Sequence, residues 1–198
     1  LGVMYELGQG VPQDYKKAVK WYRLAAEQGN AEGQFNLGEM YRKGQGVLQD
    51  YKEAVKWWKL SAEQGLAKAK YNLGVAYKNG RGVPQDYKEA VKWHRLAAEQ
   101  GLAEAQYNLG LMYADGLGVL QDHVSAYMWW NLAGSKGDKN AVTNKNTVEK
   151  DMTPQQIEKA QEMARNWKPK KRNPNHSHSY SHPLFCFCVV SLFMVRKK

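Results

Sequence analysis

The sequence predicts an all-α protein, an αα-hairpin solenoid of four 36-residue repeats closed by a C-terminal capping helix. Three observations support this prediction. Residues recur with a single period of 36, each unit holds two stretches with helical periodicity and capping residues, and no stretch alternates apolar and polar residues as a strand would. Residues 38–73 and 74–109 are identical at 25 of 36 positions, which is typical of a repeat array.

The period is visible in four kinds of residue. In every unit a glycine, a tyrosine, an aspartate and a tryptophan stand at the same place: Gly2, Gly38, Gly74 and Gly110; Tyr5, Tyr41, Tyr77 and Tyr113; Asp14, Asp50, Asp86 and Asp122; Trp21, Trp57, Trp93 and Trp129. Residues 110–145 share 14 of 36 positions with the unit before them, as expected for the degenerate end of a solenoid.

Each unit is predicted to contain two helices. The first runs from about residue 31 to 43 and ends before Gly44, a residue suited to a left-handed C-terminal cap. A loop of the form G-x-G-V-x-Q follows, and then Asp50 caps the second helix, with Glu53 placed as in a capping box. The second helix ends at Gly65 and the next unit starts almost at once. Such short connections favour antiparallel helix pairs.

Positions that stay fixed between units are predicted to form the core. They are Leu37, Gly38, Tyr41, Ala54, Trp57 and Leu60 with their equivalents. A glycine inside a helix costs about 1 kcal/mol, so we expect a neighbouring helix to approach closely there, beneath the fixed tryptophan. Ser61 replaces an alanine and is expected to be packed. His94 stands where other units have Tyr22, Trp58 or Trp130, which favours aromatic packing over catalysis.

The repeat pattern decays after Gly137. Ala141 and Val148 still indicate an amphipathic helix, and a last helix begins at Thr153, with Pro154 at its first position and Gln156 completing a capping box. We therefore divide the chain into a repeat array with a truncated first repeat, a capping helix and a tail expected to be disordered, with bounds 1–145, 146–168 and 169–198.

The net charge of +10 is concentrated beyond the repeats. Residues 1–167 carry 22 basic and 19 acidic side chains, whereas the chain from Lys168 onward has seven basic residues and no acidic one. We therefore expect no nucleic-acid partner for the folded part. The basic run 168–172 is interpreted as a solvated exit from the fold, with contact to an anionic surface as the alternative.

The rest of the tail leaves alternatives open. Its histidines and cysteines lack the spacings of zinc sites, so a flexible tail is favoured over a metal site and no cofactor is expected; they are His176, His178, His182, Cys186 and Cys188. The apolar run 184–195 has 12 residues, fewer than the about 20 that a spanning helix needs. It could dip into a membrane or be an altered terminus.

The repeat resembles a known family. It can be written L-G-x-x-Y-x-x-G-x-G-V-x-x-D-x-x-x-A-x-x-W-x-x-x-A-A-x-x-G and stands as LGEMYRKGQGVLQDYKEAVKWWKLSAEQG from Leu37. This is similar to the Sel1-like repeat, a relative of the tetratricopeptide repeat, and MTPQQIEKAQEMARNW from Met152 is similar to the closing helix of bacterial members. The resemblance implies a right-handed superhelix that acts as a protein- or peptide-binding adaptor. It also favours a periplasmic or secreted location, although the chain starts at Leu1 without a signal-peptide pattern. The chain departs from the family pattern in that the first helix of the first unit is expected to be missing before Leu1.

The expected function is a non-enzymatic, monomeric interaction scaffold. The G-x-G pairs lack the third glycine and preceding strand of a nucleotide site, and neither G-x-S-x-G nor S-x-x-K occurs. A β-lactam-binding hydrolase is the alternative that family analogy suggests, but the repeats lack the cysteine pairs of that branch. A third possibility is an adaptor tethered to a membrane by the tail.

The candidate partner-binding surface is a stripe on the first helices, which we call the first-helix stripe. Glu32, Asn36, Glu39 and Lys43 lie at helical spacing on one face. The predicted contact residues are Asn36, Glu39, Lys43, Asn72, Val75, Asn79, Asn108, Leu111 and Asp115, and we expect them on the inner face of the superhelix. The fixed asparagines are interpreted in two ways: their amides bind an extended peptide, or they make structural hydrogen bonds between repeats.

Overall fold

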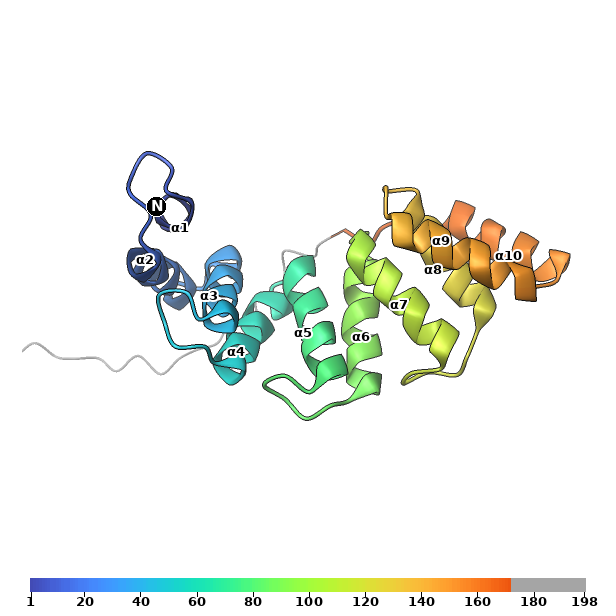
Figure 1. Cartoon of the computed structure of the whole chain (residues 1–198), viewed down its shortest axis with the longest axis horizontal. Helices are drawn as coiled ribbons and strands as arrows, with labels where there is room; N and C mark the ends of the chain where they lie inside the picture. The colour runs from blue at the N-terminus through green and yellow to red at the C-terminus, as the bar shows by residue number, and fades with distance from the viewer. Residues whose placement is uncertain (172–198) are drawn as a thin grey trace, which may run out of the picture.

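The structure is a computed structural model that describes residues 1–171. Within them the chain forms ten α-helices, one short 3₁₀ helix and no strand (Figure 1). The helices are α1 (Gly2–Leu7), α2 (Tyr15–Glu27), α3 (Ala31–Lys43), α4 (Tyr51–Glu63), α5 (Ala67–Asn79), α6 (Tyr87–Ala98), α7 (Ala103–Asp115), α8 (His123–Gly134), α9 (Lys139–Val148), η1 (Glu149–Asp151) and α10 (Pro154–Asn166). The predicted all-α solenoid of helical hairpins is confirmed.

The helices are stacked one after another along the long axis of the molecule (Figure 1). Each helix packs mainly on its neighbours in sequence, and α10 packs back on α8. In the first hairpin, Gly2–Leu7 form α1, at the place of the last turns of a first helix.

Capping residues set the helix starts as the sequence predicts. Asp50 Oδ1 accepts hydrogen bonds from the backbone nitrogens of Lys52 at 2.8 Å and Glu53 at 3.1 Å. The carboxylate of Glu53 pairs with Lys56 at 3.3 Å, so the capping box at this site is incomplete. At α10 the box is complete, with Thr153 and Gln156 bonded to each other's backbone.

The G-x-G loops are turns that bring one repeat onto the previous one. Gly44 ends α3 with a φ of 68°, and Gly46 has a φ of 72°. A Cβ atom on Gly46 would lie 2.3 Å from the carbonyl oxygen of Tyr15 at the start of α2. The loop is tied down by Gln49, whose Nε2 donates to the carbonyl of Arg42 at 2.8 Å. This explains why glycine and glutamine recur in the motif.

The aromatic residue over the helical glycine is the variable one, not the fixed tryptophan. A Cβ on Gly38 would lie 2.6 Å from ring atoms of Trp58, which is 3% exposed. The close approach of helices is therefore confirmed, but its predicted partner, Trp57, is wrong. Trp57 is half-buried against a cluster formed by α2 of the preceding repeat and by α3, whereas Trp21 of α2 is 38% exposed.

The other residues predicted to lie in the core are not all buried. Leu37 and Ala54 are fully buried, whereas Tyr41 and Leu60 are only half-buried. Ser61 is packed as expected, because its hydroxyl donates to the carbonyl of Ala31 at 2.8 Å.

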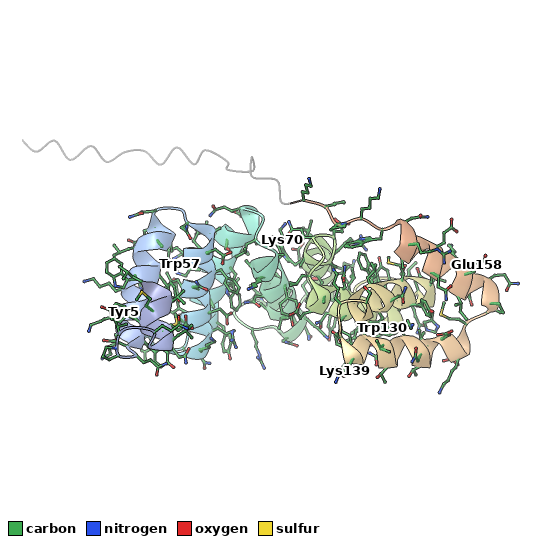
Figure 2. All side chains as sticks on the ribbon, turned by 90° about the horizontal axis from the view of Figure 1, so that it is seen from above. Tyr5, Trp57, Lys70, Trp130, Lys139 and Glu158 are labelled. Carbon is green, nitrogen blue, oxygen red and sulfur yellow. The ribbon has the colours of Figure 1, made fainter. Side chains whose placement is uncertain are left out.

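Two aromatic side chains of the second helices illustrate the same packing. His94 is fully buried and lies 5.6 Å from the ring of Tyr71, which confirms its packing role. Trp130 lies inside the array in Figure 2 and donates its Nε1 proton to the carbonyl of Tyr107.

The C-terminal helices close the array. Ala141 and Val148 of α9 are buried, as are Ala160 and Ala164 of α10, so both predicted amphipathic helices are confirmed. Residues 169–171 lie against the array, so the disorder expected from residue 169 onward is wrong for them. The predictions made for the rest of the tail, including its histidines, cysteines and apolar run, lie outside the described residues.

Candidate functional site

The first-helix stripe is borne by α3, α5 and α7, the first helices of three consecutive repeats. Its residues fall into two groups by exposure. Those nearer the helix middle are half-buried: Asn36, Glu39, Asn72, Val75, Asn108 and Leu111. Those in the last turn are exposed: Lys43, Asn79 and Asp115.

One part of the stripe is hollowed. A cavity of about 260 Å³ opens between α3, α4 and α5, where the second and third repeats meet. It contains three of the nine predicted residues, Glu39, Asn72 and Val75. Its other lining residues are Arg42, Tyr51, Trp58, Tyr71, Ala76 and Arg81. We call this the stripe hollow.

The carboxylate of Glu39 organises the hollow. Its Oε2 accepts a 2.8 Å hydrogen bond from Nη2 of Arg42, and its Oε1 accepts a 2.7 Å bond from Nδ2 of Asn72. The bond from Glu39 raises the pKa of the Arg42 guanidinium. Because Glu39 lies on α3 and Asn72 on α5, these bonds join two repeats directly.

Arg81 supplies the unpaired positive charge of the hollow. Its guanidinium lies 5.8 Å from the ring centroid of Tyr51 and makes no ion pair with any residue in 1–171. On another wall, burial raises the pKa of the Tyr71 hydroxyl, a group that is protonated near neutral pH in any case. The hollow therefore offers a cationic donor and a phenol donor to whatever enters it.

Six lining residues outside the stripe, the small Ala76 among them, were missed by the sequence argument. Arg42 carried a usable signal, because it stands three residues after Glu39, the spacing of an ion pair on a helix. Arg81 also carried a signal, because the equivalent positions of the other repeats hold the uncharged residues Gln9, Gln45 and Leu117. Tyr51, Trp58 and Tyr71 carry no such signal, because they belong to the repeat pattern.

The recurring asparagines do not share one structural role. Asn72 bonds across repeats to Glu39, whereas Asn108 donates to the carbonyl of Glu104 on its own helix at 2.9 Å. The difference follows from the preceding repeat. The position equivalent to Glu39 is Val3 for Asn36 and Val75 for Asn108, and neither can accept a hydrogen bond from an amide through its side chain. A bond to the carboxylate of the preceding repeat thus accounts for Asn72 but not for Asn36 or Asn108, and the side chain of Asn108 interacts instead with the Tyr71 hydroxyl of the repeat before it.

The outer part of the stripe is spread along the array. Lys43 lies 3.8 Å from the carboxylate of Glu6 on α1. Asn36, Lys43, Asn79, Asn108, Leu111 and Asp115 do not line the stripe hollow. The structure therefore brings together three predicted residues and leaves six along its flanks.

Within residues 1–171 there is no group of three or more histidine, cysteine, aspartate or glutamate side chains that could hold a metal ion. In the same residues no helix combines the length and the apolar character that crossing a membrane requires.

The fold and the stripe define a class, the α-solenoids built from short helical hairpins. The model of the Sel1 repeat matches four consecutive segments, residues 1–30, 31–66, 67–102 and 103–138. The chain belongs to the Sel1 repeat family. The curated proteins contain no match to it.

The chain is also similar to solved structures, two of which are described here. A Sel1 repeat protein from Oxalobacter formigenes shares 40% sequence identity with a TM-score of 0.70, over 74% of this chain and 60% of that one. A protective antigen present in uropathogenic Escherichia coli strains, which displays an SLR fold, shares 34% identity with a TM-score of 0.51, over 84% of this chain and 44% of that one. The chain thus spans less than two thirds of either protein's length.

Membership of the Sel1 repeat family indicates a general kind of function. Sel1 repeats generally mediate protein–protein interactions, and their fold is typically a non-catalytic scaffold.

Proposed function

We propose that this chain is a non-enzymatic scaffold that binds an extended segment of a partner protein along the first-helix stripe. The stripe hollow is its central contact. The observation that carries the proposal is the combination, in one cavity, of stripe residues from two repeats with the unpaired guanidinium of Arg81.

The chemistry of the hollow suits a peptide with one acidic side chain. Arg81 can form charge-assisted hydrogen bonds with a carboxylate, and its stacking on Tyr51 keeps the guanidinium in place. Glu39 is already bonded to Arg42 and Asn72, so its negative charge is largely compensated. The exposed amide of Asn79 and the half-buried amide of Asn36 supply donors and acceptors for a peptide backbone on either side.

Two other functions gain no support. The comparisons contain nothing that favours a β-lactam-binding hydrolase. The membrane-tethered adaptor depends on residues 184–195, which lie outside the described residues.

The test starts from a randomised peptide display library selected on the full chain. The selected peptide is then titrated against Arg81→Ala and Asn72→Ala. We expect each variant to raise Kd by about fivefold to tenfold, the equivalent of about 1–1.5 kcal/mol for one hydrogen-bonding group. Lys20→Ala, which removes an exposed cation of α2 outside the hollow, serves as the matched control.

The melting temperatures of all variants are measured alongside the titrations. If folded Arg81→Ala and Asn72→Ala chains bind the peptide as tightly as the parent, the stripe hollow is not the binding site. A second variant, Asn36→Ala with Asn72→Ala and Asn108→Ala, extends the test to the whole stripe. Unchanged affinity in that variant would exclude the stripe.

A further inference from the structure

The chain does not leave the fold where its last helix ends. After α10 it turns back and runs along one edge of the array (Figure 2). Trp167 is extended, with φ −69° and ψ 136°, and its ring meets that of Trp129 edge-on at a centroid distance of 6.4 Å. The Nζ of Lys136 lies 5.3 Å from the Trp167 ring centroid. Trp167 therefore directs the residues after it onto the repeats.

These residues contact the junction between the third and fourth repeats. The backbone nitrogen of Lys170 donates to the carbonyl of Glu99 at 2.7 Å, and its Nζ lies 2.9 Å from Glu99 Oε2. One residue thus makes both a backbone bond and an ion pair with the same partner. This two-point contact fixes the register of the segment on the junction.

A glycine at the junction makes room for the segment. Gly101 has a φ of 89°, and the place where its Cβ would lie is 3.6 Å from Trp167 and 3.7 Å from Pro169. The carbonyl of Gly101 accepts a hydrogen bond from Nζ of Lys136. Glycine recurs at this place in each junction because the turn needs the left-handed conformation. Because glycine has no side chain, the surface at Gly101 stays open to the segment.

The contact surface continues toward the preceding junction. A second cavity, of about 360 Å³, separates the segment from the end of the second repeat. It is lined by Gly65, Leu66, Ala67 and Gln100 on the array and by Pro169, Lys170 and Lys171 on the segment. We call the array side of this contact, Gly65–Ala67 with Glu99–Gly101, the junction ridge.

Charge on the two sides is complementary. The segment 168–171 has three lysines and no acidic residue. The junctions carry a glutamate at 36-residue spacing, Glu27, Glu63 and Glu99, and only the last of these meets the segment. Glu99 therefore favours a basic residue at this point of contact. The repeat pattern alone does not predict that any segment lies there.

We propose that the junction ridge is a docking surface for an extended basic segment, separate from the first-helix stripe, and that its occupant is the chain's own Lys168–Lys171. Glu99 selects the segment by charge and holds its backbone through its carbonyl. The docked segment covers Gly101 and extends the closure of the array beyond α10. This inference does not depend on the stripe being a binding site.

The test uses the full chain and follows the amide of Lys170 by NMR hydrogen exchange. In the parent, this amide is expected to exchange more slowly than an unstructured lysine amide, because it donates to Glu99. Glu99→Lys replaces the ion pair with a like-charge contact and is expected to accelerate exchange by about threefold or more. Lys170→Glu is expected to have the same effect at residue 170.

A charge swap separates this proposal from mere structural damage. The double variant Glu99→Lys with Lys170→Glu restores opposite charges and should recover most of the protection. Glu27→Lys, the same change at the first junction, is the matched control and should leave the exchange of Lys170 unchanged. Equal protection in the parent and in folded Glu99→Lys, or no recovery in the double variant, would overturn the proposal.

Discussion

The indole of Trp58 lies directly over the backbone of Gly38, so that a Cβ on this glycine would come within 2.6 Å of the ring atoms Cδ1 and Nε1. The same contact recurs in all four repeats, with a tyrosine, a tryptophan, a histidine and a tryptophan ring in turn. The pairs are Gly2 with Tyr22, Gly74 with His94, and Gly110 with Trp130. The helical glycine is therefore the constant half of an inter-helix contact whose other half varies.

Gly38→Ala is expected to destabilise the array despite its better helix propensity. The substitution gains about 1 kcal/mol of propensity, but overpacking a rigid core typically costs about 1–3 kcal/mol. The added methyl would also lie 3.1 Å from the backbone oxygen of Ala54, which cannot move aside easily. Urea unfolding followed by circular dichroism measures the difference.

The cause of that destabilisation can be isolated in a double-mutant cycle. In a Trp58→Ala background the clash with the ring is gone and only the contact with the Ala54 oxygen remains, so Gly38→Ala should cost clearly less than in the parent. Additive effects in the cycle would show that the two residues are not in contact.

Trp58→Ala is expected to cost about 3–5 kcal/mol of unfolding free energy, and Trp57→Ala clearly less. Trp58 is 3% exposed, whereas Trp57 is half-buried with Lys56 over its ring. Neither indole Nε1 has a hydrogen-bond acceptor within the described residues. An unpaired N–H therefore does not explain a difference in stability between the two variants. Thermal melts of the two variants measured side by side decide the order, and an equal or reversed order would contradict the burial seen here.

The sequence predicted the helices well because their signals are local. Asp50, Gly44 and Thr153 act within a few residues of where they stand, and each ends or begins a helix as expected. The prediction of core residues was partly wrong because a residue that is constant between repeats was assumed to be buried. Trp57 is constant because it meets the preceding repeat, and Trp58 varies because any flat ring can cover the glycine beneath it.

The site was harder to predict because it is made between repeats. Helical spacing predicted a shared face for Glu39 and Lys43, but it could not show that Arg81 of a later loop reaches the ring of Tyr51. The docking of Lys170 on Glu99 joins residues 71 positions apart. No period or capping rule connects them, and the basic run alone is typical of a solvated exit.

Gly46→Ala is expected to destabilise the array more than Gly44→Ala does. Both glycines have a positive φ, so both variants lose about 1 kcal/mol or more through the left-handed backbone. Gly46 alone also approaches a preceding helix, where its Cβ would lie 2.3 Å from the carbonyl oxygen of Tyr15. The two variants therefore separate backbone strain from close contact.

Chemical denaturation of the two variants gives the comparison directly. We expect a lower midpoint for Gly46→Ala by an amount that corresponds to about 1 kcal/mol or more, the usual scale of an overpacked contact. If Gly44→Ala is the more damaging of the two, the contact between the loop and α2 does not contribute to stability.

His94 makes the array sensitive to acid. Burial, with a smaller effect from the charge of Lys78, lowers the pKa of His94 to about 3, and neither ring nitrogen has a hydrogen-bond partner within residues 1–171. The unfolded chain takes up this proton below about pH 6.5, but the folded chain does so only near pH 3. The folded state is thus fully favoured above pH 6.5 and loses stability as the pH falls from there toward 3.

The expected loss has a definite size between two convenient pH values. Each pH unit within this window costs about 1.4 kcal/mol, so unfolding free energy should fall by about 2 kcal/mol from pH 7 to pH 5 on account of this one side chain. His94→Trp places over Gly74 the ring that repeats two and four already use, and it cannot titrate. The difference between parent and variant cancels the other ionisable groups. Urea unfolding at both pH values should therefore show a variant whose advantage grows on acidification, and a pH-independent difference would show that His94 is not held neutral in the fold.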